Sequence, residues 1–277
     1  MQIQTTPPEI HSENYQYLQR QVYSQTGIVL EADKHYLFES RLAPIVRQLG
    51  LGSINDLCNL LMATRQPDIG RQVVEAMTTN ETYFFREPAQ YDAIRTVLLP
   101  SIKRDRQDAK RLRVWSAAAS TGQEAYSLAM LLLQEGFGDW NIQILGTDFS
   151  SHVLARAASG KYHQIEVNRG LPSSLLVKHF SRSGVDWQLS EEVRRMVCFE
   201  SIDLRASMRA MGPFDLVFCR NVLIYFDAAT KNNILKEIHG TLFRGGWLLL
   251  GGAETAFGIE DLFDRQSVAG ATVYAAK

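Results

Sequence analysis

The sequence predicts an α/β fold in which a mostly parallel sheet follows a helical N-terminal region. Beyond residue 113, apolar strand-like runs alternate with helices, which is typical of a parallel sheet covered on both faces. Residues 1–75 carry apolar side chains at helical spacing. Over 160–195 the alternation lapses, which indicates an inserted helix and a small antiparallel hairpin. We therefore expect a helical domain over 1–77, a linker over 78–88, and a sheet domain over 89–277 with an insert at about 160–196.

Four helices are expected in the N-terminal domain. The first ends at Gly27, and Asp33 caps a second that contains a kink or a break at Pro44. Ser53 caps a third, and a fourth follows the turn RQPDIG. In the sheet domain the expected strands are 113–118, 142–148, 197–203, 214–221, 246–251 and 272–275, and the expected helices are 88–103, 123–134, 150–158 and 228–242.

The composition excludes several classes of function. The net charge of −1 provides no bulk positive field for nucleic acid or an anionic membrane. The three cysteines, Cys58, Cys198 and Cys219, show no metal-ligand spacing, so we expect no metal and reduced thiols in the core. No signal peptide or membrane-spanning run is evident, and a cytoplasmic protein is expected.

The stretch VWSAAASTGQEAYSLAMLL, from Val114 to Leu132, predicts a strand, a turn of tiny residues and a helix. Such units hold nucleotides, yet the phosphate-binding patterns G-x-x-x-x-G-K-[ST] and G-x-G-x-x-G are both absent. The turn has a single glycine, Gly122, and Glu124 stands where the helix begins. Two like charges about 4 Å apart repel by about 4 kcal/mol at an effective dielectric near 20, so Glu124 disfavours a bound phosphate.

S-adenosylmethionine fits this turn better, because it has no phosphate and carries a sulfonium and an ammonium group. Glu124 can accept its ammonium or a ribose hydroxyl, and Asp148 ends the second strand where an acid can accept a ribose diol. Each acid also has a structural explanation. Asp148 can cap the next helix with Ser150, and Glu124 can interact with its own helix dipole. Together, at neighbouring strand ends, the two acids favour an adenosyl ligand.

Two later segments end at the same predicted edge. In SIDL, Ser201–Leu204, a backbone group and Leu204 can flank an adenine. In FDLVFCRNVLIYFD the fourth strand ends in Arg220 and Asn221, followed by Tyr225. The structural alternatives are a turn at Asn221 and a core position for Tyr225.

Four segments in order resemble the CheR family of chemotaxis receptor methyltransferases: MTTNETYFFRE, RVWSAAASTGQEAYSLA, GPFDLVFCRNVLIYFD and the terminal GGA…TVY. The helical region, with GIVLEADKHYLFESRL, is similar as well. The resemblance implies a class I S-adenosylmethionine-dependent methyltransferase domain, Rossmann-like, with a small inserted antiparallel β-subdomain, preceded by an all-α domain. It also implies methylation of glutamate side chains on chemoreceptors, with S-adenosylhomocysteine as the product, during chemosensory adaptation.

The resemblance implies site residues as well. Arg86 and Tyr225 correspond to the pair beside the reacting methyl group, and the linker contributes to the cofactor site. The implied cofactor contacts are Asn80, Thr82, Arg86, Glu124, Asp148, Asp203, Leu204, Asn221 and Val222. Two positions depart from the family: Gln123 replaces a second acid, and Asp203 replaces a common asparagine, whose contact we expect to be made by the backbone.

Receptor docking is expected to use a basic helix face bearing Lys34 and Arg41, seven residues apart, with Arg47 displaced around the helix axis, although solvated helix charges are the commoner explanation. The hairpin loop within FSRSGVDWQL is shorter than in family members that dock on a receptor tail, so no tethering peptide is expected. A nicotinamide oxidoreductase and an inactive cofactor-binding module are the competing hypotheses. The glycine-poor turn disfavours the first, and Arg86 with Tyr225 disfavours the second.

No general base is expected, because a glutamate is already ionised at neutral pH with a reference pKa of about 4.3. Arg86 can grip a carboxylate in a bidentate manner, either that of the cofactor or that of the receptor glutamate.

Overall fold

The computed structural model describes residues 10–277 except residues 32, 65 and 257. The chain divides into two compact units. One contains the residues up to Thr79 together with Tyr225–Asp227, and the other contains Asn80–Ile224 and Ala228–Lys277.

The first unit is helical, as predicted, and its described helices are α1 (Ser12–Thr26), α2 (His35–Gln48), α3 (Ile54–Ala63) and α4 (Pro67–Ala76). They pack around a core that includes Leu18, Phe38 and Leu57, none of which is exposed. Since an isolated helix of 10 to 15 residues is marginal in water, this shared apolar core stabilises the helices.

Two predicted helix ends are confirmed and three details are corrected. Gly27 ends α1 with a left-handed φ of 76°, and the Ser53 hydroxyl accepts the Asp56 N–H at the start of α3. Asp33 was expected to cap α2, but Lys34 occupies that position. Of the kink or break expected at Pro44, the break does not occur, because α2 continues through the proline. The predicted RQPDIG turn is partly helical, since proline fits the first turn of a helix and α4 begins at Pro67.

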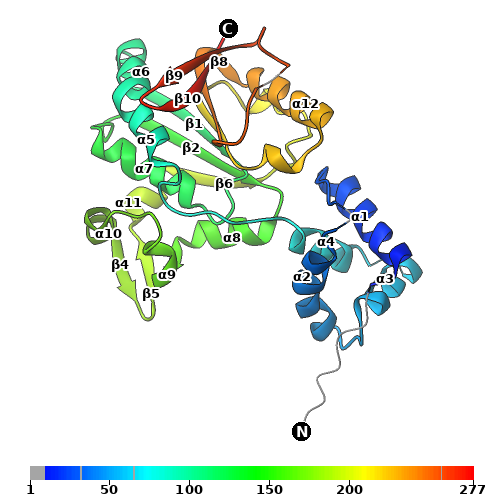
Figure 1. The fold of residues 1–277 in the computed structure, drawn as a ribbon. Helices are drawn as coiled ribbons and strands as arrows, with labels where there is room; N and C mark the ends of the chain where they lie inside the picture. Colours follow the sequence, from blue (N-terminus) through cyan, green and yellow to red (C-terminus); the bar gives the residue numbers. More distant parts are fainter. Residues whose placement is uncertain (1–9, 32, 65, 257) are drawn as a thin grey trace. The chain divides into compact units, whose positions relative to one another are not determined.

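The second unit contains a seven-stranded sheet in the order β6-β2-β1-β7-β8-β10-β9 (Figure 1). Its strands are β1 (Arg111–Ala117), β2 (Asn141–Asp148), β6 (Val197–Ser201), β7 (Phe214–Cys219), β8 (Leu242–Leu250), β9 (Phe263–Val268) and β10 (Ala271–Ala276). The pairs β6-β2, β2-β1, β1-β7 and β7-β8 are parallel, whereas β10 is antiparallel to both of its neighbours. The predicted α/β class is confirmed. Strand β9 was not predicted.

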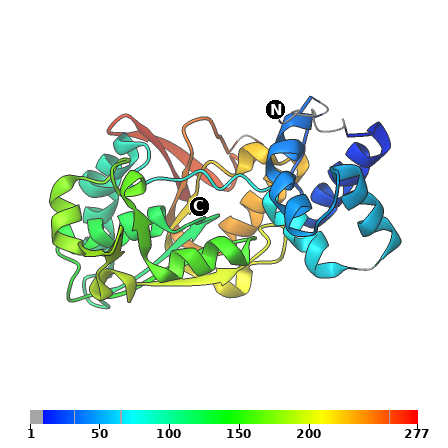
Figure 2. The same ribbon diagram turned by 90° about the horizontal axis from the view of Figure 1, so that it is seen from below.

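Helices cover both faces of this sheet. The connection from β1 to β2 runs through α7 (Gln123–Gln134), and the one from β7 to β8 through α12 (Ala228–His239). These crossovers advance in opposite directions along the sheet, so right-handed connections place their helices on opposite faces (Figures 1 and 2). The predicted helix 88–103 is α5 (Pro88–Ala93), a π-helical segment (Ile94–Leu98) and α6 (Leu99–Arg106) in succession. Helix α8 (Ser151–Ser159) follows β2.

The insert forms a small subdomain at one side of the second unit (Figure 1). A three-stranded antiparallel sheet has the order β3-β5-β4, with β3 (Lys161–His163), β4 (Phe180–Ser183) and β5 (Asp186–Leu189). The short helices α9 (Gln164–Val167), α10 (Ser173–His179) and α11 (Glu191–Arg194) accompany it. The expected helix and hairpin are confirmed, with an additional strand and two additional helices.

The cysteine prediction holds for two of the three residues. Cys58 and Cys219 are free and buried, whereas Cys198 is exposed, because β6 lies at the edge of the sheet. Among the described residues, no helix has both the length and the apolar character to span a membrane.

Candidate functional site

The carboxyl ends of β6, β2, β1 and β7 lie at one edge of the sheet, because these strands are parallel neighbours. The turn after β1 is sharply folded, with left-handed φ values at Ala118 (56°), Ser120 (51°) and Gly122 (91°). A Cβ atom on Gly122 would lie only 2.9 Å from the Cβ of Ala157. The single glycine of the turn is therefore required both for its φ and for the close approach of α8.

Asp148, at the end of β2, is buried and fixes this turn. Its Oδ2 accepts the Ser120 N–H at 2.9 Å, and its Oδ1 accepts the Ser150 N–H at 3.0 Å. Ser150 is the N-cap of α8, so Asp148 does support the start of this helix, which is the structural role considered for it above. Main-chain N–H groups from two different segments therefore order both oxygens of the Asp148 carboxylate.

Glu124 is held by protein groups on both of its carboxylate oxygens. Oε1 accepts the Ser116 hydroxyl at 2.7 Å, and Oε2 accepts from the Arg220 guanidinium at 3.0 Å. Burial raises the pKa of Glu124 above its ordinary value, and the Arg220 guanidinium opposes that rise. Glu124 is therefore ion-paired rather than an isolated charge, and it repels a phosphate less strongly than the sequence alone predicts.

Arg220 is the central cation of the edge, and its side chain is only 1% exposed. It donates to the Arg86 carbonyl at 2.6 Å and lies 3.4 Å from Glu87 Oε2. Burial lowers the pKa of Arg220, but Glu124 and its other acidic neighbours raise it above its ordinary value. Although burial raises the pKa of Glu87, Arg220 and the Gly252 N–H bring it below its ordinary value. Both groups therefore remain charged at neutral pH.

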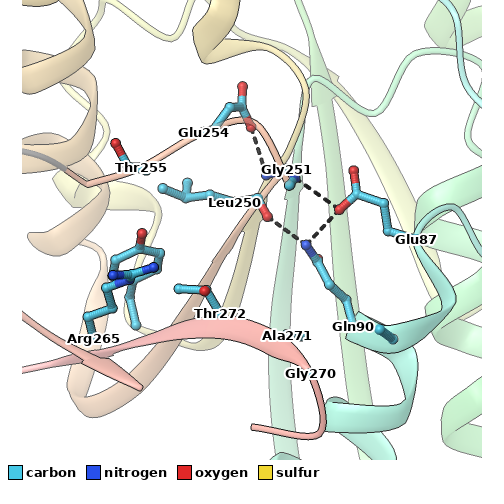
Figure 3. A pocket seen from close by; sticks show the side chains of 13 residues that line it. Glu87, Gln90, Leu250, Gly251, Glu254, Thr255, Arg265, Gly270, Ala271 and Thr272 are labelled. Atoms are coloured by element: carbon cyan, nitrogen blue, oxygen red, sulfur yellow. Dashed lines mark hydrogen bonds between the residues drawn. The ribbon is translucent and has the colours of Figure 1, made fainter. Parts of the chain in front are cut away.

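Asn221, which follows β7, lies between two further carboxylates. It adopts a left-handed φ of 57°, and its N–H donates to Glu254 Oε2 at 2.7 Å. Its side-chain amide donates to Glu87 Oε1 at 3.3 Å. Glu87 and Glu254 also line a cavity of about 230 Å³. Figure 3 shows this cavity, with Gln90 and Arg265 among its other lining residues.

Of the predicted residues in the segment 80–86, Asn80 contacts the turn after β1. The Asn80 carbonyl accepts the Ser120 hydroxyl at 2.9 Å, and Thr82 is half-buried. The Arg86 guanidinium donates to the Glu81 carbonyl at 3.2 Å and lies 5.5 Å from the centre of the Tyr83 ring. Because this contact is made to the Glu81 backbone, Arg86 and Glu81 do not form a surface ion pair, which would have been a purely structural role for Arg86. The Glu81 carboxylate pairs with Arg169 at 2.6 Å instead.

After β6, the side chain of Asp203 is engaged locally. Arg205 donates to both of its oxygens, at 3.0 and 2.6 Å, so the carboxylate is tied two residues along the chain. Leu204 is buried, and Val222, after Asn221, is half-buried. The Asp203 carboxylate is therefore engaged within its own loop, and the expected adenine contact through the Asp203 backbone stays a prediction.

The remaining predicted residues belong to the helical unit. The Tyr225 carbonyl accepts the Val29 N–H at 2.9 Å, and since Arg86 belongs to the other unit, their pairing stays a prediction. Arg41 donates to the Met77 and Thr78 carbonyls at 2.7 and 3.0 Å.

Lys34 precedes α2 rather than lying within it, and its ammonium is 3.5 Å from Asp33. Arg47 is exposed. The proposed basic face is therefore partly committed to contacts within the helical unit.

Sequence reasoning missed Glu87 and Glu254 as members of the site, and it named Arg220 only as a polar residue at the edge. Nothing in the local pattern marks Glu254, because two of its three main-chain partners come from the loop after β7, about 30 residues earlier. The sequence does offer one indication for Glu87, because this residue directly precedes a proline that begins a helix.

The edge suits a cationic ligand without phosphate. Glu87 and Glu124 contribute two negative charges and Arg220 one positive charge, which leaves a net charge of −1 beside Asp148. S-adenosylmethionine, with a sulfonium, an ammonium and a carboxylate, carries a net positive charge. The donor set of the edge therefore fits this cofactor. Within the described part of the chain, no group of three or more His, Cys, Asp or Glu residues is arranged to hold a metal ion.

Comparisons with known proteins agree with this assignment. Residues 80–271 match the family described as "CheR methyltransferase, SAM binding domain", and residues 13–78 match "CheR methyltransferase, all-alpha domain". The chain is 37% identical to chemotaxis protein methyltransferase Cher2 of Pseudomonas putida, over 91% of this chain and 93% of that protein. It is 38% identical to chemotaxis protein methyltransferase 1 of Pseudomonas aeruginosa, again over 91% and 93%.

A solved structure, the glycopeptide N-methyltransferase MtfA complexed with sinefungin, matches 61% of this chain and 50% of its own. The identity is 16% and the TM-score 0.37, a likeness too low to support an inference.

Proposed function

The chain belongs to the CheR methyltransferase family, and on that premise we propose that it methylates glutamate side chains of chemoreceptors, using S-adenosylmethionine. The products are glutamyl methyl esters and S-adenosylhomocysteine. The observation that carries the proposal is the pair of acids, Glu124 and Asp148, fixed at adjacent strand ends in the family's cofactor-binding domain.

The cofactor supplies the methyl group, which it carries on a sulfonium. The residues proposed to hold it come from the linker 78–88 and from four strand ends: Asn80, Thr82, Arg86, Glu124, Asp148, Asp203, Leu204, Asn221 and Val222. Asp148 accepts ribose hydroxyls, and Leu204 flanks the adenine. Because Glu124 is already paired with Arg220, it contributes mainly a fixed negative field for the cationic part.

The remaining contribution of the protein to the reaction is to position the reacting groups. The receptor glutamate is ionised at neutral pH, so no side chain has to remove a proton. Arg86 grips a carboxylate through its planar guanidinium, and Tyr225 lies beside the reacting group. Holding the attacking oxygen in line and excluding water lowers the barrier without acid–base catalysis.

Receptor docking is proposed for the helical unit through Lys34, Arg41 and Arg47, which offer positive charge to glutamate-rich receptor helices. The β4–β5 hairpin has only Gly184 and Val185 between its strands, which supports action without a tethering peptide. Since the proposed substrate is the cytoplasmic helical region of the receptors, we place the protein in the cytoplasm.

The test is transfer of a labelled methyl group from S-adenosylmethionine to receptor membranes. Label that appears on the receptor, and is released by base as methanol, supports glutamyl ester formation. A receptor whose candidate glutamates are changed to alanine is the matched control and should stay unlabelled. Receptors with and without their C-terminal tails should be labelled at equal rates. No base-labile label on any receptor of a panel would contradict the proposal.

A further inference from the structure

Glu254 binds three main-chain N–H groups from two different loops. Its Oε2 accepts the Gly251 and Asn221 N–H groups, both at 2.7 Å, and its Oε1 accepts the Ile224 N–H at 3.2 Å. The residue is 9% exposed, and Figure 3 shows its bond to Gly251 at the end of β8. One buried carboxylate therefore joins the end of β8 to the loop after β7.

The loop that Glu254 binds has a conformation that needs support. Asn221 lies at a left-handed φ of 57°, a conformation that is unfavourable for residues other than glycine, although asparagine tolerates it better than most. Hydrogen bonds to a charged acceptor are about twice as strong as neutral ones, so the Glu254 carboxylate offsets this cost. Ile224, whose N–H donates to Glu254, belongs to the 3₁₀ turn Leu223–Tyr225 that follows Asn221 in the chain.

Two neighbouring features fit the same role. A Cβ atom on Gly251 would lie 2.5 Å from Asn221 Nδ2 and 2.8 Å from Glu254 Oε2, so only glycine leaves room for these contacts. Glu87 holds the other side of Asn221 through the side-chain amide, and it also accepts the Gly252 N–H at 3.1 Å. Figure 3 shows Glu87 and Glu254 on either side of the chain that leaves β8.

We propose that Glu254 is a positioning residue for methyl transfer: it holds the backbone of Asn221–Ile224 in the conformation that contacts the cofactor. This inference rests on the proposed function, in which Asn221 and Val222 contact S-adenosylmethionine. Glutamine at position 254 keeps the shape but has one acceptor oxygen and an NH₂ group that cannot accept. The E254Q variant therefore loses at least one of the three bonds.

The test compares E254Q with E260Q in the full-length protein. Glu260 is the matched control, because its carboxylate is exposed and also accepts a main-chain N–H, from Gly258 at 3.0 Å, but lies outside the loop after β7. We expect E254Q to weaken S-adenosylhomocysteine binding about tenfold to a hundredfold by calorimetry, as for lost hydrogen bonds to a charge. E260Q should bind as the wild type does.

Amide hydrogen exchange of the ligand-free protein gives a readout that a general loss of stability would not produce. In E254Q, the N–H groups of Asn221 and Ile224 should exchange faster, whereas those of Leu216 and Phe218 in β7 should not change. This measurement needs neither ligand nor receptor. It therefore tests the role of Glu254 even if the wild type fails to bind S-adenosylhomocysteine, which would refute the proposed function.

G251A is the second variant, since its added methyl group displaces the same contacts without removing a charge, and it should reproduce both effects. A folded E254Q protein with wild-type affinity and unchanged exchange at Asn221 and Ile224 would overturn the proposal. Unfolding of both variants would make Glu254 a determinant of the fold instead, and would overturn the proposal as well.

Discussion

Replacing Arg220 by methionine is the sharpest test of the buried charges at the sheet edge. The Arg220 side chain is 1% exposed and lies 3.0 Å from Glu124 Oε2 and 3.4 Å from Glu87 Oε2. R220M leaves these two carboxylates without their cation, and breaking a buried pair in this way costs about 3–5 kcal/mol. We expect the free energy of unfolding to fall by that amount at neutral pH.

The stability lost in R220M depends on pH, and the structure predicts the direction of that dependence. Burial already raises the pKa of Glu124, and removal of Arg220 raises it further. The folded variant then binds a proton at a pH where the unfolded chain has released it, so its stability increases as the pH falls. The difference in unfolding free energy between the wild type and R220M should therefore shrink as the pH falls toward 4.5, the ordinary pKa of a glutamate.

Urea unfolding of the wild type, R220M, E124Q and the double variant measures the coupling, which should be about 1–3 kcal/mol for groups in direct contact. R205M is the matched control. Arg205 also pairs with an acid, Asp203, but their side chains are 29% and 32% exposed, so its loss should be below about 1 kcal/mol. If R220M costs no more than R205M, or if the coupling is near zero, the interpretation of Arg220 as the central cation is wrong.

Three further outcomes are expected. E87Q should lower stability at neutral pH by an amount that shrinks as the pH falls below 4.5, the ordinary pKa of a glutamate, because a carboxylate whose pKa is depressed in the folded state contributes its full stability only above that pH. A pH-independent loss in chemical denaturation would contradict this expectation. G122A should weaken S-adenosylhomocysteine binding and destabilise the fold by about 1–3 kcal/mol, since the φ of Gly122 is 91° and the new methyl group would lie 2.9 Å from the Cβ of Ala157. A melting temperature and an affinity equal to those of the wild type would argue against this expectation. A thiol reagent should modify Cys198 alone in the folded protein, because Cys58 and Cys219 are buried, and burial raises the pKa of Cys58 to about 11. Fast labelling of more than one thiol, counted by mass spectrometry, would refute this expectation.

Much of the fold could be predicted because its signals are local. The apolar run of β7 and the helical spacing of α7 each lie within one short segment, and the bounds of α7 agree with the prediction. Strand β9 was missed because its sequence FDRQSV is largely polar, and its burial pattern is mostly exposed. Such an edge strand forms through its pairing with β10, which no local pattern encodes.

The candidate site was predictable in its acids but not in their partners. Glu124 and Asp148 follow strands, so their placement at one edge follows from the parallel order of the sheet. The ion pair of Glu124 with Arg220 spans 96 residues, and its geometry depends on how β1 and β7 pair. Helix capping erred by one residue at Asp33, because the choice between neighbouring polar residues depends on contacts beyond the turn.

Binding of S-adenosylhomocysteine to the wild type and to D148N is the most direct test of the claim that this acidic edge holds an adenosyl cofactor. Asp148 lies at the end of β2 with both oxygens already ordered by main-chain N–H groups, so the substitution changes charge and acceptor number while keeping shape. We predict one-to-one binding to the wild type, weakened about tenfold or more in D148N, with D139N, at an exposed acid paired with Lys110, as the unaffected control. Equal affinities for the wild type and D148N, or no binding to the wild type, would contradict the claim.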